Sequence, residues 1–204
     1  MANLLIVYAS SLGNTKRMAD AIADGARRVE GVDVQIRHVD DARLGEVRDC
    51  DALVLGSPVR HGNADARLRR FIEQDCEPLS TRGHLADKIA AVFTVGANFG
   101  HHGDGGEIAQ LALLRAFAAA GMTIVSACSE ARDTILSRPY WGPHARVRAH
   151  EGPQTLQPDM LLQANQHGLR VAKLARAVTG HGPSTPPRNW RLPGVFHRIS
   201  AALR

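Results

Sequence analysis

An α/β fold with a doubly wound parallel sheet is predicted by the pattern of apolar and polar residues along this chain. Five short apolar segments alternate with segments of helical period, and the central apolar segments carry no polar residue on either face. Strands of that kind are buried on both sides, which requires helices on both faces of a parallel sheet. Two short strand orders are common for such a sheet, and both place a ligand at the carboxyl ends of the strands, beside the point where the strand order reverses.

The expected elements follow one another regularly. A buried strand over 4–8 precedes a helix with apolar positions from Met18 to Val29, which ends at Gly31. Strict alternation over 32–37 predicts a strand at an edge of the sheet. The remaining expected elements are strands at 52–56, 89–95 and 123–127 and helices around 68–72, 108–117 and 161–178.

Composition limits the class of protein. The 204 residues are 44% hydrophobic and 22% charged, which is typical of one globular domain. No apolar run approaches the roughly 20 residues of a membrane helix, and the N-terminal segment lacks the features of a signal peptide, so we expect a cytoplasmic protein. Because Cys50, Cys76 and Cys128 form no CxxC pair, we expect reduced core thiols rather than disulfides or zinc ligands.

Positive charge is concentrated at the C-terminus. Residues 180–204 carry four arginines and no acid, so the formal net charge of +5 falls to +1 on residues 1–179. We therefore expect one domain over 1–179, with an inserted loop region at 129–157, and a proline-rich basic tail at 180–204 with a short amphipathic helix. Docking of the tail on its own domain or on a neighbouring subunit is favoured over contact with an anionic membrane, and no nucleic-acid partner is expected.

Residues 10–15, called the phosphate loop from here on, join the first strand to the first helix. Backbone N–H groups at a helix start suit a phosphate, and Ser and Thr hydroxyls add donors. The segment lacks the three glycines of a dinucleotide fingerprint and the Gly-Lys-Ser/Thr of Walker A, so one glycine among hydroxyls favours a terminal phosphate monoester. The alternative is a plain N-cap of the helix.

Several motifs of this chain are similar to motifs of a known family, and they occur in the same order along the chain. Ser-x-x-Gly-x-Thr after a first strand is similar to the phosphate loop of flavodoxins, which bind FMN. Residues 56–63, Gly-Ser-Pro-Val-Arg-His-Gly-Asn, resemble a segment of the WrbA-type NAD(P)H:quinone oxidoreductases, in the NADPH-dependent FMN reductase superfamily. The resemblance covers roughly residues 3–179, with further landmarks at 83–88, 105–107, 121–122 and 139–142.

This resemblance implies a five-stranded parallel sheet in the flavodoxin-like order 2-1-3-4-5, with an FMN site at the carboxyl ends of the strands. The residues matching the family's phosphate site are Ser10, Leu12, Gly13, Asn14 and Thr15. Those matching its ring site are Pro58, Val59, Arg60, His61, Gly62, Gly96, Ala97, Asn98, Phe99 and Gly100. Arg60 is suited to stabilise the negative charge of reduced flavin, and its alternative role is a surface salt bridge.

The sequence also departs from the family pattern. Ser80 stands near the position of a family Trp that frames the substrate pocket, and Ala120 replaces a family His of the flavin pocket. His61 replaces an aromatic residue that contacts the ring, and the third loop is lengthened. Trp141 is a candidate replacement for the lost aromatic wall.

The histidines suggest proton transfer rather than metal binding. His101 and His102 are candidates to supply protons during quinone reduction, and the alternative is a solvent-facing loop role. No spacing of His, Cys and carboxylates matches a metal site, so no metal is expected.

The prediction is therefore an FMN-dependent oxidoreductase that passes electrons from NAD(P)H to a quinone or similar small acceptor. The resemblance implies a homodimer or homotetramer. One alternative is an electron-transfer flavodoxin, a class that is usually acidic, whereas residues 1–179 are near neutral. The other is a non-enzymatic interaction protein that has kept the fold and lost the cofactor.

Overall fold

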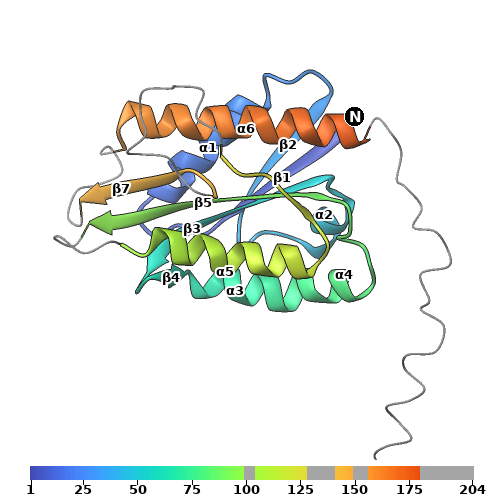
Figure 1. Cartoon of the computed structure of the whole chain (residues 1–204), viewed down its shortest axis with the longest axis horizontal. Helices are drawn as coiled ribbons and strands as arrows, with labels where there is room; N and C mark the ends of the chain where they lie inside the picture. The colour runs from blue at the N-terminus through green and yellow to red at the C-terminus, as the bar shows by residue number, and fades with distance from the viewer. Residues whose placement is uncertain (99–103, 128–140, 149–155, 180–204) are drawn as a thin grey trace, which may run out of the picture.

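The protein is a parallel sheet enclosed between two layers of helices (Figure 1). A computed structural model describes residues 1–98, 104–127, 141–148 and 156–179. The strand order is β2-β1-β3-β5-β6, with β4 paired to β3 and β7 paired to β5. This is the expected 2-1-3-4-5 order, so the predicted fold class is confirmed. The predicted tail at 180–204 lies outside the described residues.

Three parallel strands form the centre of the sheet. These are β1 (Ala2–Tyr8), β3 (Ala52–Arg60) and β5 (Ile89–Asn98), and β2 (Val32–His38) lies at the expected edge beside β1. The register sets Tyr8 beside Gly56 and Gly56 beside Phe93. A Cβ on Gly56 would overlap the Phe93 ring, so this position requires glycine for close packing. The carboxyl ends of all three strands therefore lie at one side of the domain.

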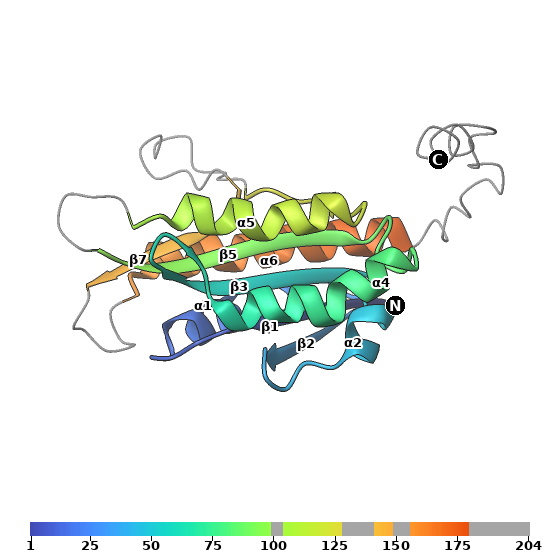
Figure 2. The ribbon, with the colours of Figure 1, turned by 90° about the horizontal axis from the view of Figure 1, so that it is seen from below.

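Alternate residues of each central strand face two separate cores. Even-numbered residues of β1 such as Leu4 and Ile6 pack with α1 (Asn14–Ala26) and α6 (Pro158–Thr179). Odd-numbered residues such as Leu5 and Val7 pack in the second core. In Figure 2 the helices of that second layer face the viewer. They are α3 (Ala66–Phe71), α4 (Glu77–Thr81) and α5 (Gly106–Ala119), and α2 (Leu44–Asp49) contributes Val47 to the same core.

Helices α1 and α6 approach each other closely through two glycines. A Cβ on Gly25 of α1 would overlap the backbone carbonyl of Asn165, and one on Gly168 of α6 would overlap that of Ile22. The absence of a side chain at these two positions therefore allows the two helices to pack closely over the first core.

The last strand of the sheet differs from its prediction. Only Thr123–Ile124, which form β6, pair with the start of β5, in place of the strand expected at 123–127. The far half of β5 pairs instead with β7 (His144–Arg148), inside the region expected to be an inserted loop at 129–157. The edge strand is thus split in two. Strand β7 contains only two apolar residues, Ala145 and Val147, which is too weak a pattern to indicate a strand.

Two helical features were also not predicted. Helix α2 is absent from the expected elements, and its six residues are too few for a periodic signal. The helix expected around 68–72 extends over 66–81, because a π-helical turn, η1 (Ile72–Cys76), joins α3 to α4. Such turns insert one extra residue per turn and escape a search for a period of 3.6.

The cysteines of the described residues are core thiols. Cys50 and Cys76 are free and buried, as predicted, and burial raises the pKa of each to about 12. Cys128 lies outside the described residues. Within the described ranges, no helix is long and apolar enough to cross a membrane.

His167 is an ionisable side chain enclosed in the first layer. It lies on the buried face of α6, is 1% exposed, and neither ring nitrogen has a hydrogen-bond partner. Burial, with a smaller effect from the charge of Arg170, lowers the pKa of His167 to about 4. The folded protein therefore holds this imidazole neutral at pH values where the unfolded chain protonates it.

We expect acid to destabilise the fold through His167. The unfolded state binds a proton below an ordinary pKa of about 6.5, and the folded state only near 4, so stability falls as the pH drops through this window, by about 3 kcal/mol at pH 4. Urea unfolding at neutral and acidic pH measures this loss. The variant His167→Leu should lose less stability on acidification than the wild type, and equal losses in both proteins would contradict the prediction.

Candidate functional site

The phosphate loop forms a tight turn at the start of α1. Gly13 adopts φ 82°, a left-handed conformation that favours glycine, and its amide donates to Ser10 Oγ at 3.1 Å. Asn14 and Thr15 are buried at the first turn of the helix, whereas the Leu12 side chain is 68% exposed. Leu12 is thus expected to contribute only its backbone to a ligand.

This loop leaves polar groups without partners inside the protein. Gly13 is the N-cap of α1, but no side chain caps the helix, in contrast to the alternative of a plain N-cap. The Asn14 side-chain oxygen is buried and has no hydrogen-bond partner. A buried acceptor without a donor is costly, and first-turn amides have no intrahelical acceptor. The loop is therefore suited to a ligand with both hydroxyl and anionic groups.

The second loop is a hairpin beside the phosphate loop. Strand β3 turns at His61 and Gly62, both with positive φ, and returns as β4 (Asn63–Ala64). Two successive positive φ values are typical of a two-residue hairpin turn that matches the strand twist. A Cβ on Gly105, before α5, would overlap the Gly62 backbone, so the hairpin tip lies against the start of α5.

The expected ring-site residues of the hairpin occupy different environments. Pro58 and Val59 are half-buried in β3, and His61 is exposed at the tip. The Arg60 guanidinium is directed to the phosphate loop, where Nη2 donates to Ser11 Oγ at 2.7 Å. Arg60 Nε also lies 3.8 Å from the Asp65 carboxylate. Arg60 therefore also forms a salt bridge, which was the alternative prediction for this residue.

Asp65 is a buried carboxylate between the hairpin and α3. It caps α3 by accepting from the Arg67 amide at 3.0 Å, and its own amide donates to Ser57 Oγ at 2.9 Å. The Arg67 guanidinium donates to both carboxylate oxygens, at 3.0 and 3.1 Å. These bonds from Arg67, aided by the charge of Arg60, lower the pKa of Asp65 against the opposing effect of burial.

The third loop begins later than predicted. Gly96, Ala97 and Asn98 were expected in a loop but belong to β5, because β7 provides a pairing partner out to Arg148. A Cβ on Gly96 would overlap the Asp104 carboxylate, so this glycine makes room for a side chain of the protein itself. Phe99, Gly100, His101 and His102 lie outside the described residues.

A buried polar chain links β5, β7 and the start of α5. His144 Nδ1 lies 2.8 Å from Thr94 Oγ1, and His144 Nε2 lies 2.8 Å from Asp104 Oδ2. Asp104 Oδ1 accepts from the Gly106 amide at 3.0 Å, and Arg146 Nε lies 3.7 Å from Asp104 Oδ2. Burial acts to raise the pKa of Asp104, but His144, Gly106 and Arg146 together lower it below its ordinary value.

Gln110 extends this chain inside the protein. Its amide nitrogen donates to Thr94 Oγ1 and to the carbonyl of Gly142, both at 3.0 Å, and its oxygen accepts from the Gly142 amide at 3.1 Å. Gly142 lies two residues before the first residue of β7, so Gln110 joins the segment that leads into β7 to α5. Every polar atom of this amide is thus used to hold the split edge strand in place.

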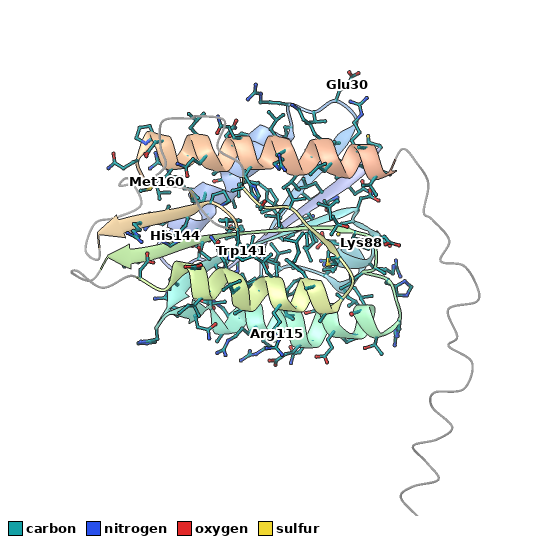
Figure 3. The ribbon with its side chains drawn as sticks, in the orientation of Figure 1. Glu30, Lys88, Arg115, Trp141, His144 and Met160 are labelled. Atoms are coloured by element: carbon teal, nitrogen blue, oxygen red, sulfur yellow. The ribbon has the colours of Figure 1, made fainter. Side chains whose placement is uncertain are left out.

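Trp141 lies at the end of the insertion, before β7. Its side chain is 37% exposed, and its carbonyl accepts from the Ala127 amide at 2.9 Å. Gly142 beside it packs against the Val92 carbonyl, in the middle of β5. Figure 3 places Trp141 farther than His144 from the carboxyl ends of β5 and β7. Its role as an aromatic wall stays a prediction.

Two of the three substituted positions of the family pattern lie in a separate groove. Ser80 and Ala120 both line a groove of about 490 Å³ between α4 and α5, together with Ile72, Cys76 and Ala116. Ala120 directly follows α5, whose C-terminal end lies near the amino ends of β5 and β6. Within one chain, this groove is therefore at the opposite end of the sheet from the phosphate loop.

The described part of the site contains no metal-binding cluster, and some of its polar residues could not be predicted from the sequence. Across the described ranges, no three His, Cys, Asp or Glu side chains are placed to hold a metal ion. No pattern in the sequence marks Asp65, Arg67, Asp104 or His144 as members of linked clusters. Asp65 could have been recognised as an N-cap before a helix, whereas nothing in the sequence pairs Asp104 with a histidine 40 residues away.

The fold and this site define a doubly wound protein with a phosphate-type loop after β1. A model of the flavodoxin domain matches residues 5–111, just over half of the chain, and the chain therefore belongs to the flavodoxin domain family. A flavodoxin of Aquifex aeolicus (strain VF5) is 36% identical over 114 residues. That match covers 56% of this chain and only 59% of the relative's length.

Solved structures show the same fold. A flavodoxin, WrbA-like protein from Agrobacterium tumefaciens superposes with a TM-score of 0.66 at 23% identity, over 87% of this chain and 99% of the other. Oxidised flavodoxin 1 from Bacillus cereus superposes with a TM-score of 0.62 at 20% identity, over 84% of this chain and 98% of the other. At these identities the likeness concerns the fold.

We expect Asp104 and His144 to stabilise the fold as a coupled pair. Replacing His144 by Leu should cost about 2 kcal/mol, because a carboxylate only 4% exposed loses its best partner. In a double-mutant cycle with Asp104→Asn, followed by urea unfolding, the double variant should lose at least about 1 kcal/mol less than the sum of the single losses. Simple additivity would show that the two side chains act independently.

Proposed function

We propose that this chain binds FMN and acts as an FMN-dependent oxidoreductase of the WrbA type, transferring electrons from NAD(P)H to a quinone or similar small acceptor. The phosphate loop carries this proposal, because a left-handed Gly13, an uncapped helix start and the unpartnered Asn14 oxygen occur together. FMN presents a phosphate to the helix start and ribityl hydroxyls to a buried acceptor. The residues present therefore fit this cofactor.

Three parts of the chain would hold FMN. Ser10, Gly13, Asn14 and Thr15 would bind the phosphate and its adjoining chain, with the Leu12 backbone. The hairpin from Pro58 to Gly62 would lie along one side of the ring, and the segment after β5 along another. Bound FMN supplies hydride and electron transfer, and the protein supplies position and electrostatics. His101 and His102 stay candidates for proton supply, and Trp141 for a wall of the acceptor pocket.

The second candidate function is electron transfer as a flavodoxin without its own substrate site. It is favoured by the 36% identity to the Aquifex aeolicus flavodoxin. Two observations favour the oxidoreductase instead. Residues 1–179 are near neutral, whereas electron-transfer flavodoxins are usually acidic, and the hairpin sequence at 56–63 resembles that of WrbA-type enzymes. The proposed homodimer or homotetramer would use the segment 129–157 and the tail, which lie largely outside the described residues.

We expect the purified protein to bind added FMN at micromolar concentration, with a flavin band near 450 nm. The variant Asn14→Leu should weaken FMN binding at least tenfold, because the ligand loses a buried polar partner worth about 1.4 kcal/mol or more. The stability of the variant without flavin should not fall, since the lost oxygen had no partner. Asp24→Asn, an exposed position on the same helix, is the matched control. Failure of the wild type to bind FMN would overturn the proposal.

We expect the FMN-loaded protein to oxidise NADH or NADPH continuously when a soluble quinone is present. A substrate site predicts many turnovers per FMN, which are measured as a continuous loss of nicotinamide absorbance. An electron carrier instead predicts negligible nicotinamide oxidation, although its FMN is reduced by a chemical reductant. The second result would reject the oxidoreductase in favour of the flavodoxin, and this assay thus separates the two candidates.

A further inference from the structure

Two arginine side chains converge on the outer side of the phosphate loop. Arg60 Nη2 lies 2.7 Å from Ser11 Oγ, and Arg67 Nη2 lies 3.5 Å from the same oxygen. Arg60 comes from the end of β3 and Arg67 from α3, so two different elements direct a guanidinium to one hydroxyl of the loop. Ser11 is exposed, which leaves this side of the loop open to a ligand.

Asp65 holds both guanidinium groups in this orientation. Its carboxylate receives two hydrogen bonds from Arg67 and lies 3.8 Å from Arg60 Nε, and its side chain is only 8% exposed. The position of Asp65 is itself set by the α3 cap and by the bond from its amide to Ser57. Little side-chain entropy is therefore lost when Arg67 binds a ligand, whereas Arg60, whose side chain is 51% exposed, is restrained less.

The two guanidinium groups share one directly paired carboxylate. Asp65 bonds to Arg67 and lies 3.8 Å from Arg60, whereas Asp40 adds only a longer-range attraction to Arg67. The remaining N–H donors that reach the phosphate loop meet only the hydroxyl of Ser11. A hydroxyl is a weak partner for a guanidinium, and an anion would be a stronger one.

We propose that Arg60 and Arg67 form a clamp that binds the phosphate of FMN from the solvent side and thereby selects phosphorylated over unphosphorylated flavin. The inference rests on the proposed FMN function and adds a residue, Arg67, that lies outside the phosphate loop and the hairpin. The amides and hydroxyls of the loop, with the unpartnered Asn14, would bind the inner side of the same ligand. In this arrangement the Arg60 guanidinium faces the phosphate, while the rest of the hairpin lies along the ring.

The clamp is tested by comparing two flavins that differ only in the phosphate. Protein without flavin is titrated with FMN and with riboflavin, and binding is followed by quenching of flavin fluorescence. The variants are Arg67→Gln, the double variant Arg60→Gln/Arg67→Gln, and Arg67→Lys. Arg70→Gln is the control of equal charge change, because Arg70 is an exposed arginine on the same helix.

The clamp predicts that Arg67→Gln weakens FMN binding about tenfold and the double variant more, with riboflavin binding unchanged. Arg67→Lys should retain part of the affinity for FMN, and Arg70→Gln should bind FMN as tightly as the wild type. Added salt should lower the ratio of FMN affinity to riboflavin affinity in the wild type. Equal losses for both flavins, or no loss for either, would overturn the clamp while FMN binding by the wild type still stands. A wild type that binds neither flavin would overturn the FMN function and the clamp together.

Discussion

The parallel register of β1, β3 and β5 is the constraint on which the rest of the molecule depends. It sets Tyr8, Gly56 and Phe93 side by side, so the loops that follow the three strands leave the sheet at one edge. The register is fixed by burial, because alternate residues of each strand belong to two different cores. A slip by one residue would exchange Leu4 with Leu5 between the cores and disrupt both.

Polar contacts position the loops that the strands bring together. Asp65 joins the hairpin to α3, and Asp104 joins the start of α5 to β7 through His144. Each carboxylate is nearly enclosed and has charged or hydrogen-bonding partners, which is the condition under which burial of a charge is tolerated. Two glycines at positive φ, in the hairpin and before α5, then let the loops touch.

The proposed FMN site combines two kinds of anion recognition. The helix start offers backbone amides and a fixed dipole, so the protein recognises the phosphate there without using a charged side chain. The arginines on the outer side add formal charge, and Asp65 restrains them. The basic character of the chain is therefore not confined to the tail, although most of the net charge of +5 is carried there. Within the domain, whose net charge is only +1, Arg60 and Arg67 place positive charge beside the phosphate loop.

The sequence by itself determined the α/β class, the strand order, the two-sided burial of the central strands and the place of the phosphate loop. The class, the burial and the loop follow from periods of two and 3.6 residues and from short local motifs, whereas the strand order follows from the resemblance of those motifs to the flavodoxins. Only the tertiary structure decided the split edge strand with β7, the direction of Arg60, and the pairs Arg67–Ser11 and Asp104–His144. Those pairs join residues 56 and 40 positions apart. Contacts between distant segments depend on how elements pack and leave no periodic trace in the chain.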